Sequence, residues 1–130
     1  MEFQEAINLF INQQQLHNNF WNFQLVVILG VVGALAANHK LSTSSHLFFV
    51  LLATYLTFSF FTGFAMFESQ SRLFVLGNAI QMLAPSGEIY EDIAEAHRPT
   101  HPYLVMASHS FLVIVSFAVF CLISRLHNRK

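Results

Sequence analysis

Charged residues are scarce in this sequence: Asp, Glu, Lys and Arg together make up 10% of the 130 residues, whereas 55% are hydrophobic and 15% are aromatic. A water-soluble domain of this length needs roughly a quarter of its residues charged to cover its surface. The mean hydropathy of +0.52 agrees with this shortage of charge. The composition therefore argues against a soluble domain and favours a membrane protein.

The few charges are also confined to short segments. No Asp, Glu, Lys or Arg occurs between Glu5 and Lys40, between Lys40 and Glu68, or between Arg98 and Arg125. Each interval is longer than the roughly 20 residues that a helix needs to cross about 30 Å of hydrocarbon. The apolar cores of these intervals predict a single all-α membrane domain with three transmembrane helices, over residues 20–37, 46–67 and 103–123.

The patterns of a membrane barrel and of a cleaved signal peptide are both missing. Without alternation of apolar and polar residues no barrel is predicted, so each span must bond its backbone internally as a helix. No Lys or Arg precedes the first span, and the only triplet that resembles a cleavage site is Ala34-Leu35-Ala36. Because a signal peptide begins with basic residues, we expect the first span to be retained.

Motifs for catalysis are lacking as well. The sequence has no nucleotide-binding loop, nucleophile elbow, metalloprotease helix or paired carboxylates, and its basic residues are too few for a nucleic-acid surface. Its single cysteine, Cys121, cannot form an intramolecular disulfide. We therefore expect neither an enzyme nor a nucleic-acid-binding protein, and the sequence assigns no cofactor.

The basic residues that are present predict the orientation in the membrane. Lys40, Arg125, Arg129 and Lys130 flank the spans on one side, whereas acidic residues dominate the 68–102 connection on the other. Since Lys and Arg are retained on the cytoplasmic side, we expect the N-terminus outside and the C-terminus in the cytoplasm. This charge bias fits a multi-pass protein of a bacterial inner membrane.

Two segments outside the spans have helical patterns. Residues 2–19 predict a short amphipathic helix lying on the outside face of the membrane, with a frayed terminus as the alternative. In the 68–102 connection, an apolar stripe predicts another such helix over 72–84. Pro85, Ser86 and Gly87 should separate it from a further short helix over 88–97.

Small residues gather on one face of the first span, namely Gly30, Gly33, Ala34 and Ala37. Such a face lets another helix approach closely. The approaching helix could belong to this chain or to a partner chain, and the sequence favours neither.

Polar residues recur at helical spacing in the other two spans: Tyr55, Ser59 and Thr62 in the second, His109 and Ser116 in the third. We expect these stripes to face each other, with Thr62 and His109 at similar depth. An ionisable residue within a span is costly and needs a partner, which singles out His109. A hydrogen bond between helices, a proton relay, and a haem or metal role remain alternative explanations.

Three residues near the outside end of the third span, Glu95, His97 and His101, offer groups that suit zinc, copper or iron. Pro99 prevents the two histidines from sharing a regular helical face, so ordinary surface histidines are the alternative. A haem bridged between spans is not expected, because the first two spans lack a histidine deep enough and His17 precedes the first span.

Three functional hypotheses follow from these features. The first is an accessory or structural subunit that packs against another membrane protein in the lipid bilayer. The second is a homo-oligomeric pore or transporter whose polar stripes line a path between copies. The third is a small metal- or redox-linked membrane protein that uses its histidines.

Overall fold

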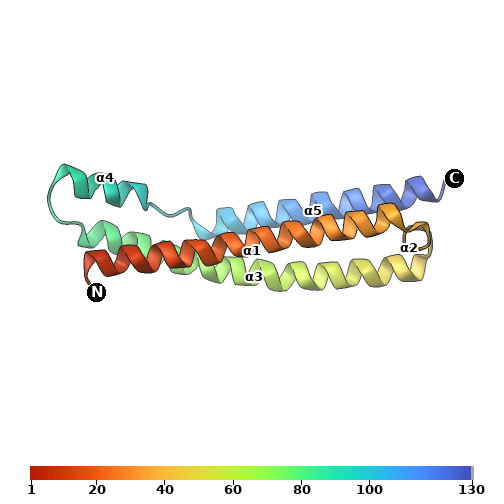
Figure 1. The fold of residues 1–130 in the computed structure, drawn as a ribbon, viewed down its shortest axis with the longest axis horizontal. Helices are drawn as coiled ribbons and strands as arrows, with labels where there is room; N and C mark the ends of the chain where they lie inside the picture. Colours follow the sequence, from red (N-terminus) through yellow and green to blue (C-terminus); the bar gives the residue numbers. More distant parts are fainter. Residues whose placement is uncertain (130) are drawn as a thin grey trace.

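The computed structural model describes residues 1–129, and these form five α-helices: α1 (Phe3–Ala37), α2 (His39–Thr43), α3 (Ser45–Leu83), α4 (Glu88–Ala96) and α5 (Pro102–His127). Lys130, one of the predicted cytoplasmic charges, lies outside the described residues. Figure 1 shows α1, α3 and α5 side by side in an elongated bundle, with α4 and the N-terminus at one end and α2 and the C-terminus at the other.

Helices α1, α3 and α5 are each long and apolar enough to cross a membrane. The predicted spans at 20–37, 46–67 and 103–123 each lie within one of them. The all-α fold with three long apolar helices is thus confirmed. These helices indicate a multi-pass membrane protein.

The predicted separate amphipathic helices at 2–19 and 72–84 are wrong, because both segments continue the long helices α1 and α3 without a break. No proline interrupts either helix, so the ladder of backbone hydrogen bonds runs on. At about 1.5 Å per residue, the 35 residues of α1 and the 39 residues of α3 are far longer than a crossing of about 30 Å requires. Of the three short helices predicted outside the spans, only the one over 88–97 is separate, as α4, and Gly87, with φ +143°, turns the chain into it.

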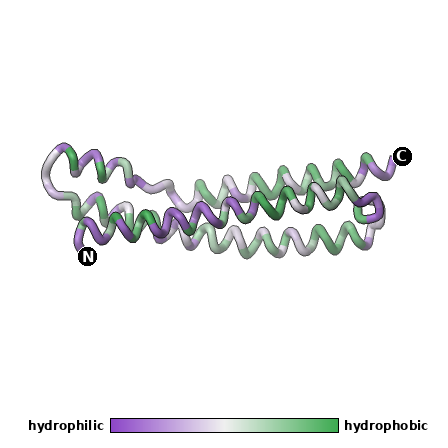
Figure 2. Tube along the Cα trace, viewed as in Figure 1, coloured by the Kyte–Doolittle hydropathy of each residue, from purple (hydrophilic) through white to green (hydrophobic). Residues whose placement is uncertain are grey.

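The extra length of α1 and α3 forms a small helical unit with α4, which we call the head (residues 1–19 and 68–101). Its core consists of Ala6, Ile7, Phe10, Leu73, Ile80 and Ala94. All seven Asp and Glu residues of the chain belong to the head. In Figure 2 hydrophilic and hydrophobic colours alternate at this end, whereas the hydrophobic colour predominates along the rest of the bundle.

The remaining bundle, which we call the stem, comprises residues 20–67 and 102–127. Its core has Leu35, Tyr55 and Phe120 at the centre, with the Tyr55 and Phe120 rings edge to face at 4.9 Å. Helices α1 and α5 run in the same direction and α3 runs against them (Figure 1). This arrangement brings the polar stripes of α3 and α5 to the same interior.

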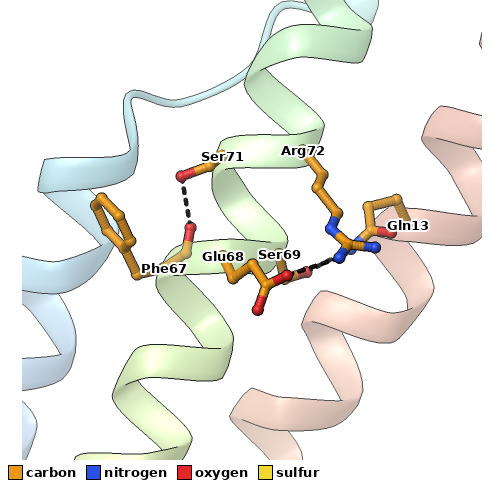
Figure 3. Close-up of polar contacts among 6 residues, drawn as sticks. All are labelled: Gln13, Phe67, Glu68, Ser69, Ser71 and Arg72. Atoms are coloured by element: carbon orange, nitrogen blue, oxygen red, sulfur yellow. Dashed lines mark hydrogen bonds and ion pairs between the residues drawn. The ribbon is translucent and has the colours of Figure 1, made fainter.

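Polar contacts tie the helices together at both ends of the stem. At the head junction, Gln13 of α1 donates from Nε2 to Oγ of Ser69 of α3 at 2.9 Å, beside the exposed ion pair of Arg72 and Glu68 (Figure 3). At the opposite end, the Ser42 hydroxyl of α2 bonds to Nδ1 of His127 of α5. The first contact joins α1 to α3, and the second joins α2 to α5.

Candidate functional site in the polar interior of the bundle

All five residues of the predicted polar stripes are buried within this single chain. Their exposed fractions are 2% for Tyr55, 2% for Ser59, 7% for Thr62, 4% for His109 and 4% for Ser116. A polar side chain is costly to bury without a partner, so the hydrogen bonds of each one matter for what the interior can do.

The hydroxyl groups of Thr62 and Ser116 each form a hydrogen bond within their own helix. The Thr62 hydroxyl donates to the Phe58 carbonyl at 3.0 Å, and the Ser116 hydroxyl donates to the Leu112 carbonyl at 2.7 Å. Such bonds back to the preceding turn make a hydroxyl compatible with an apolar interior. These two residues therefore need no ligand.

His109 lies in a tight slot between α1 and α3. A Cβ built on Gly63 would come within 3 Å of the imidazole, and the Trp21 ring of α1 is tilted against it with ring centroids 6.3 Å apart. Its Nε2 is buried and has no hydrogen-bond partner among residues 1–129. The imidazole is thus held in place by packing and not by a hydrogen bond at Nε2.

Two buried polar residues of α1, His17 and Gln24, were missed by the sequence analysis. Their exposed fractions are 6% and 0%. His17 accepts a hydrogen bond at Nε2 from the Trp21 indole at 3.1 Å, and Gln24 donates from Nε2 to Oγ of Ser59 at 3.0 Å. The polar interior is therefore built from three helices, whereas the sequence predicted contributions from α3 and α5 only.

The seven-residue spacing of apolar and polar residues in α1 could have revealed that His17 and Gln24 are buried. His17 and Gln24 lie seven positions apart, and Phe10 lies a further seven positions before His17. This period places all three on the same face of a helix that packs in a bundle. Treating residue 19 as the end of a separate surface helix hid that continuity.

Four buried polar atoms of this interior have no partner among residues 1–129: His17 Nδ1, Gln24 Oε1, the Tyr55 hydroxyl and His109 Nε2. Buried polar groups are nearly always hydrogen-bonded to protein, water or ligand. Their concentration in one bundle interior marks it as the candidate functional region. It offers imidazole, amide and hydroxyl groups, and no carboxylate or amine.

The proposed metal residues are not arranged as a metal site. His97 bonds through Nδ1 to the Ile93 carbonyl at 2.7 Å and lies edge to face with Phe10, whereas His101 stacks on Tyr103. Glu95 is exposed on α4. Among residues 1–129, no group of three or more His, Cys, Asp and Glu side chains is placed to hold a metal ion.

The small residues of α1 point away from the chain's own helices. A Cβ added to Gly30 or Gly33 would meet nothing within 4 Å. Ala37 is exposed and Ala34 is half-buried. At Gly30 and Gly33 this face therefore contacts no other helix of the same chain. Of the two contacts predicted from the sequence, this leaves the one with a partner chain.

Comparison with protein-family models, with curated proteins and with solved structures found no match for this chain. The function is therefore argued from the geometry of the bundle.

Proposed function

We propose that this protein is an accessory or structural subunit of a larger membrane assembly, without enzymatic activity of its own. The observation that carries the proposal is the inward orientation of the polar stripes. The side chains of Tyr55, Ser59, Thr62, His109 and Ser116 are all buried within one chain. The stem surface left to neighbours is mostly apolar, with a few exposed hydroxyls such as those of Thr57, Ser108 and Ser110. This is expected for a subunit that packs against lipid and against other membrane helices.

The same orientation weighs against the pore hypothesis. A path between several copies needs polar side chains on the surfaces where the copies meet. The outside of the stem instead presents large apolar side chains, such as Phe60 at 71%, Leu29 at 69% and Phe111 at 69% exposure. Copies joined through these residues would enclose a hydrophobic surface.

The open glycines of α1 offer a specific place for a neighbouring helix. Gly30 and Gly33 lie one turn apart, with nothing of this chain above them. In lipid, helices associate through close backbone approach at small residues. We propose that this face, together with Ala34 and Ala37, receives a helix of the partner protein.

The proposed setting is a bacterial inner membrane, with the head outside and α2 and the C-terminus in the cytoplasm. Four of the six Lys and Arg residues, Lys40, Arg125, Arg129 and Lys130, are at the α2 end or in the C-terminal tail, whereas the head has Arg72 and Arg98 together with all seven acidic residues. This distribution follows the retention of Lys and Arg on the cytoplasmic side.

The first test is the mass and polypeptide content of the native complex after gentle solubilisation. The proposal expects a second polypeptide in fixed ratio to this 14.8 kDa chain. A single polypeptide at a fixed multiple of that mass would contradict the proposal and favour a self-assembled pore.

A substitution then locates the contact. Gly30→Leu should release the partner while the chain keeps its fold, because nothing of this chain lies within 4 Å of that position. Val26→Leu is the matched control, since it also changes an exposed α1 position, at 63% exposure, but replaces no small residue. Retention of the partner by Gly30→Leu would remove the small-residue face from the proposal.

A further inference from the structure

The side of α1 that faces away from the chain's own helices carries a line of side-chain amides. Five such residues recur at every third or fourth position, the spacing of a single helix face, and all are exposed: Asn8, Asn12, Gln15, Asn19 and Asn22. We call them the amide face. None of these side chains has a hydrogen-bond partner among residues 1–129, whereas Gln13 and Gln24 of the same helix each bond to a serine of α3.

Hydration alone does not account for the amide face. A helix surface that meets only water usually carries Lys, Glu and other strong helix formers, and the rest of the head does so with Glu68, Arg72 and the acidic residues of α4. In α1, by contrast, no charged residue follows Glu5. Asparagine, which predominates in the amide face, is among the poorer helix formers. A helix that departs from local preference on an exposed face indicates a functional contact there.

The amide face continues into the open glycines of the same helix. Gly30 and Gly33 lie 11 positions, or three turns, after Asn19 and Asn22. A Cβ at either glycine would meet nothing within 4 Å. From Asn8 to Gly33, about 38 Å at 1.5 Å per residue, this side of α1 is therefore open to a neighbour. A helix that lies over the glycines and keeps close to the direction of α1 also runs along the amides.

Asn22 gives a physical reason for the contact to extend beyond the glycines. It is exposed and lies within the predicted span 20–37, and hydrocarbon offers a side-chain amide no hydrogen bond. In membranes, Asn and Gln side chains bond across helices. A helix packed on Gly30 and Gly33 comes within about three turns of Asn22, so it can supply the missing partner.

The chemistry of the amide face defines the side chains that complement it. Each amide offers N–H donors and a carbonyl acceptor without carrying a charge. Side chains that also donate and accept satisfy it, whereas a charged side chain would lose its water without gaining a counter-charge. The matching residue types are Asn, Gln, Ser and Thr.

We propose that the partner helix on Gly30 and Gly33 extends out of the membrane along the amide face. It presents Asn, Gln, Ser or Thr to that face at every third or fourth position. This inference rests on the proposed role as a subunit and names the chemistry of the partner.

An isosteric substitution tests the contact. Asn12→Asp keeps the shape of the side chain and adds a negative charge, which water tolerates and a contact between neutral amides does not. The complex of the full-length chain with its second polypeptide, gently solubilised and placed in lipid nanodiscs, is diluted and followed by mass photometry. Its dissociation constant should rise about tenfold or more in the variant. Asn78→Asp, the same change at an exposed amide of α3 in the head, is the matched control and should bind as the wild type does.

A photo-crosslinker identifies what lies on the amide face. In a Cys121→Ala background, benzophenone maleimide is attached to Gln15→Cys and, as the control, to Asn78→Cys. Light should join position 15, and not position 78, to the second polypeptide. Mass spectrometry of the joined peptide should identify a segment directly outside a membrane span, with Asn, Gln, Ser or Thr at every third or fourth position.

The outcomes separate this inference from the proposed function. A wild-type complex without a second polypeptide would refute the role as a subunit, and this inference with it. A second polypeptide that binds the wild type and Asn12→Asp equally would leave the subunit role intact and overturn the amide contact. A crosslink between two copies of this 14.8 kDa chain, or to a segment rich in charged residues, would also overturn it.

Discussion

Gly63 of α3 lies directly against the imidazole of His109 of α5: a Cβ on Gly63 would stand 2.8 Å from Cε1 and 2.9 Å from Nδ1 of that ring. Real Cβ atoms essentially never come this close to another heavy atom. The approach of these two helices therefore depends on the missing side chain, as in other close helix pairs of membrane proteins.

Replacing Gly63 by alanine should destabilise the protein. The added methyl group pushes the His109 ring against Trp21, and overpacking of this kind typically costs about 1–3 kcal/mol. Unfolding in mixed detergent micelles, followed by circular dichroism, measures the change. Gly30→Ala is the matched control and should change stability by less than about 0.5 kcal/mol, because its Cβ meets nothing within 4 Å. Equal stability of the two variants would contradict the tight contact.

Gly77 has a comparable role where the connection before α5 crosses α3. A Cβ there would stand 2.6 Å from Cγ of Pro99 and 2.9 Å from the His97 carbonyl oxygen. Gly77→Ala should therefore lift residues 97–100 off α3 and loosen the head while the stem stays folded. Limited proteolysis should cut the connection faster in this variant than in Gly33→Ala, whose Cβ meets nothing within 4 Å. Identical cleavage rates would argue against the contact.

The buried hydrogen bond from Gln24 to Ser59 should couple α1 to α3. A double-mutant cycle with Gln24→Leu and Ser59→Ala isolates the interaction, and its coupling energy should be about 0.6 kcal/mol, with an upper bound near 1.7 kcal/mol. Gln15→Leu replaces an exposed glutamine of the same helix and serves as the control. A coupling energy of zero within error would mean that the two side chains are not bonded in the membrane.

The orientation can be tested with single cysteines. In a Cys121→Ala background, Glu91→Cys in the head should react with a membrane-impermeant maleimide added to intact cells, and Lys40→Cys should react only after the membrane is opened. Each position is exposed, so a lack of reaction reports the side of the membrane. The reverse pattern would place the head in the cytoplasm.

The three long apolar helices were predictable from composition, because a bilayer imposes a length and a polarity on any helix that crosses it. Residues 20–37, 46–67 and 103–123 each lie within one long helix. The short α4 was predictable for a different reason, since Pro85 and Gly87 interrupt the chain before it. In both cases the determining residues lie within or next to the helix concerned, so the helix can be predicted from the sequence alone.

The continuity of α1 and α3 beyond the spans was not predictable in the same way. The change from polar to apolar residues near Phe20 suggested the end of one helix and the start of another. A change in side-chain polarity does not, however, interrupt the backbone hydrogen bonds of a helix. The extended helices are held together by residues far apart in the sequence, since Phe10 of α1 and Leu73 of α3 belong to the same hydrophobic core. This misplaced boundary also hid His17 and Gln24.

The sequence by itself determined that this protein is helical and apolar, with three segments able to cross a bilayer, because the cost of exposing charge and unpaired backbone to lipid acts on each segment separately. Tertiary structure alone decided which residues face one another: that Gln24 bonds to Ser59, that His109 fits against Gly63, and that Gly30 stays open. The rotation of a helix about its axis depends on the helices packed against it, and no single segment contains that information.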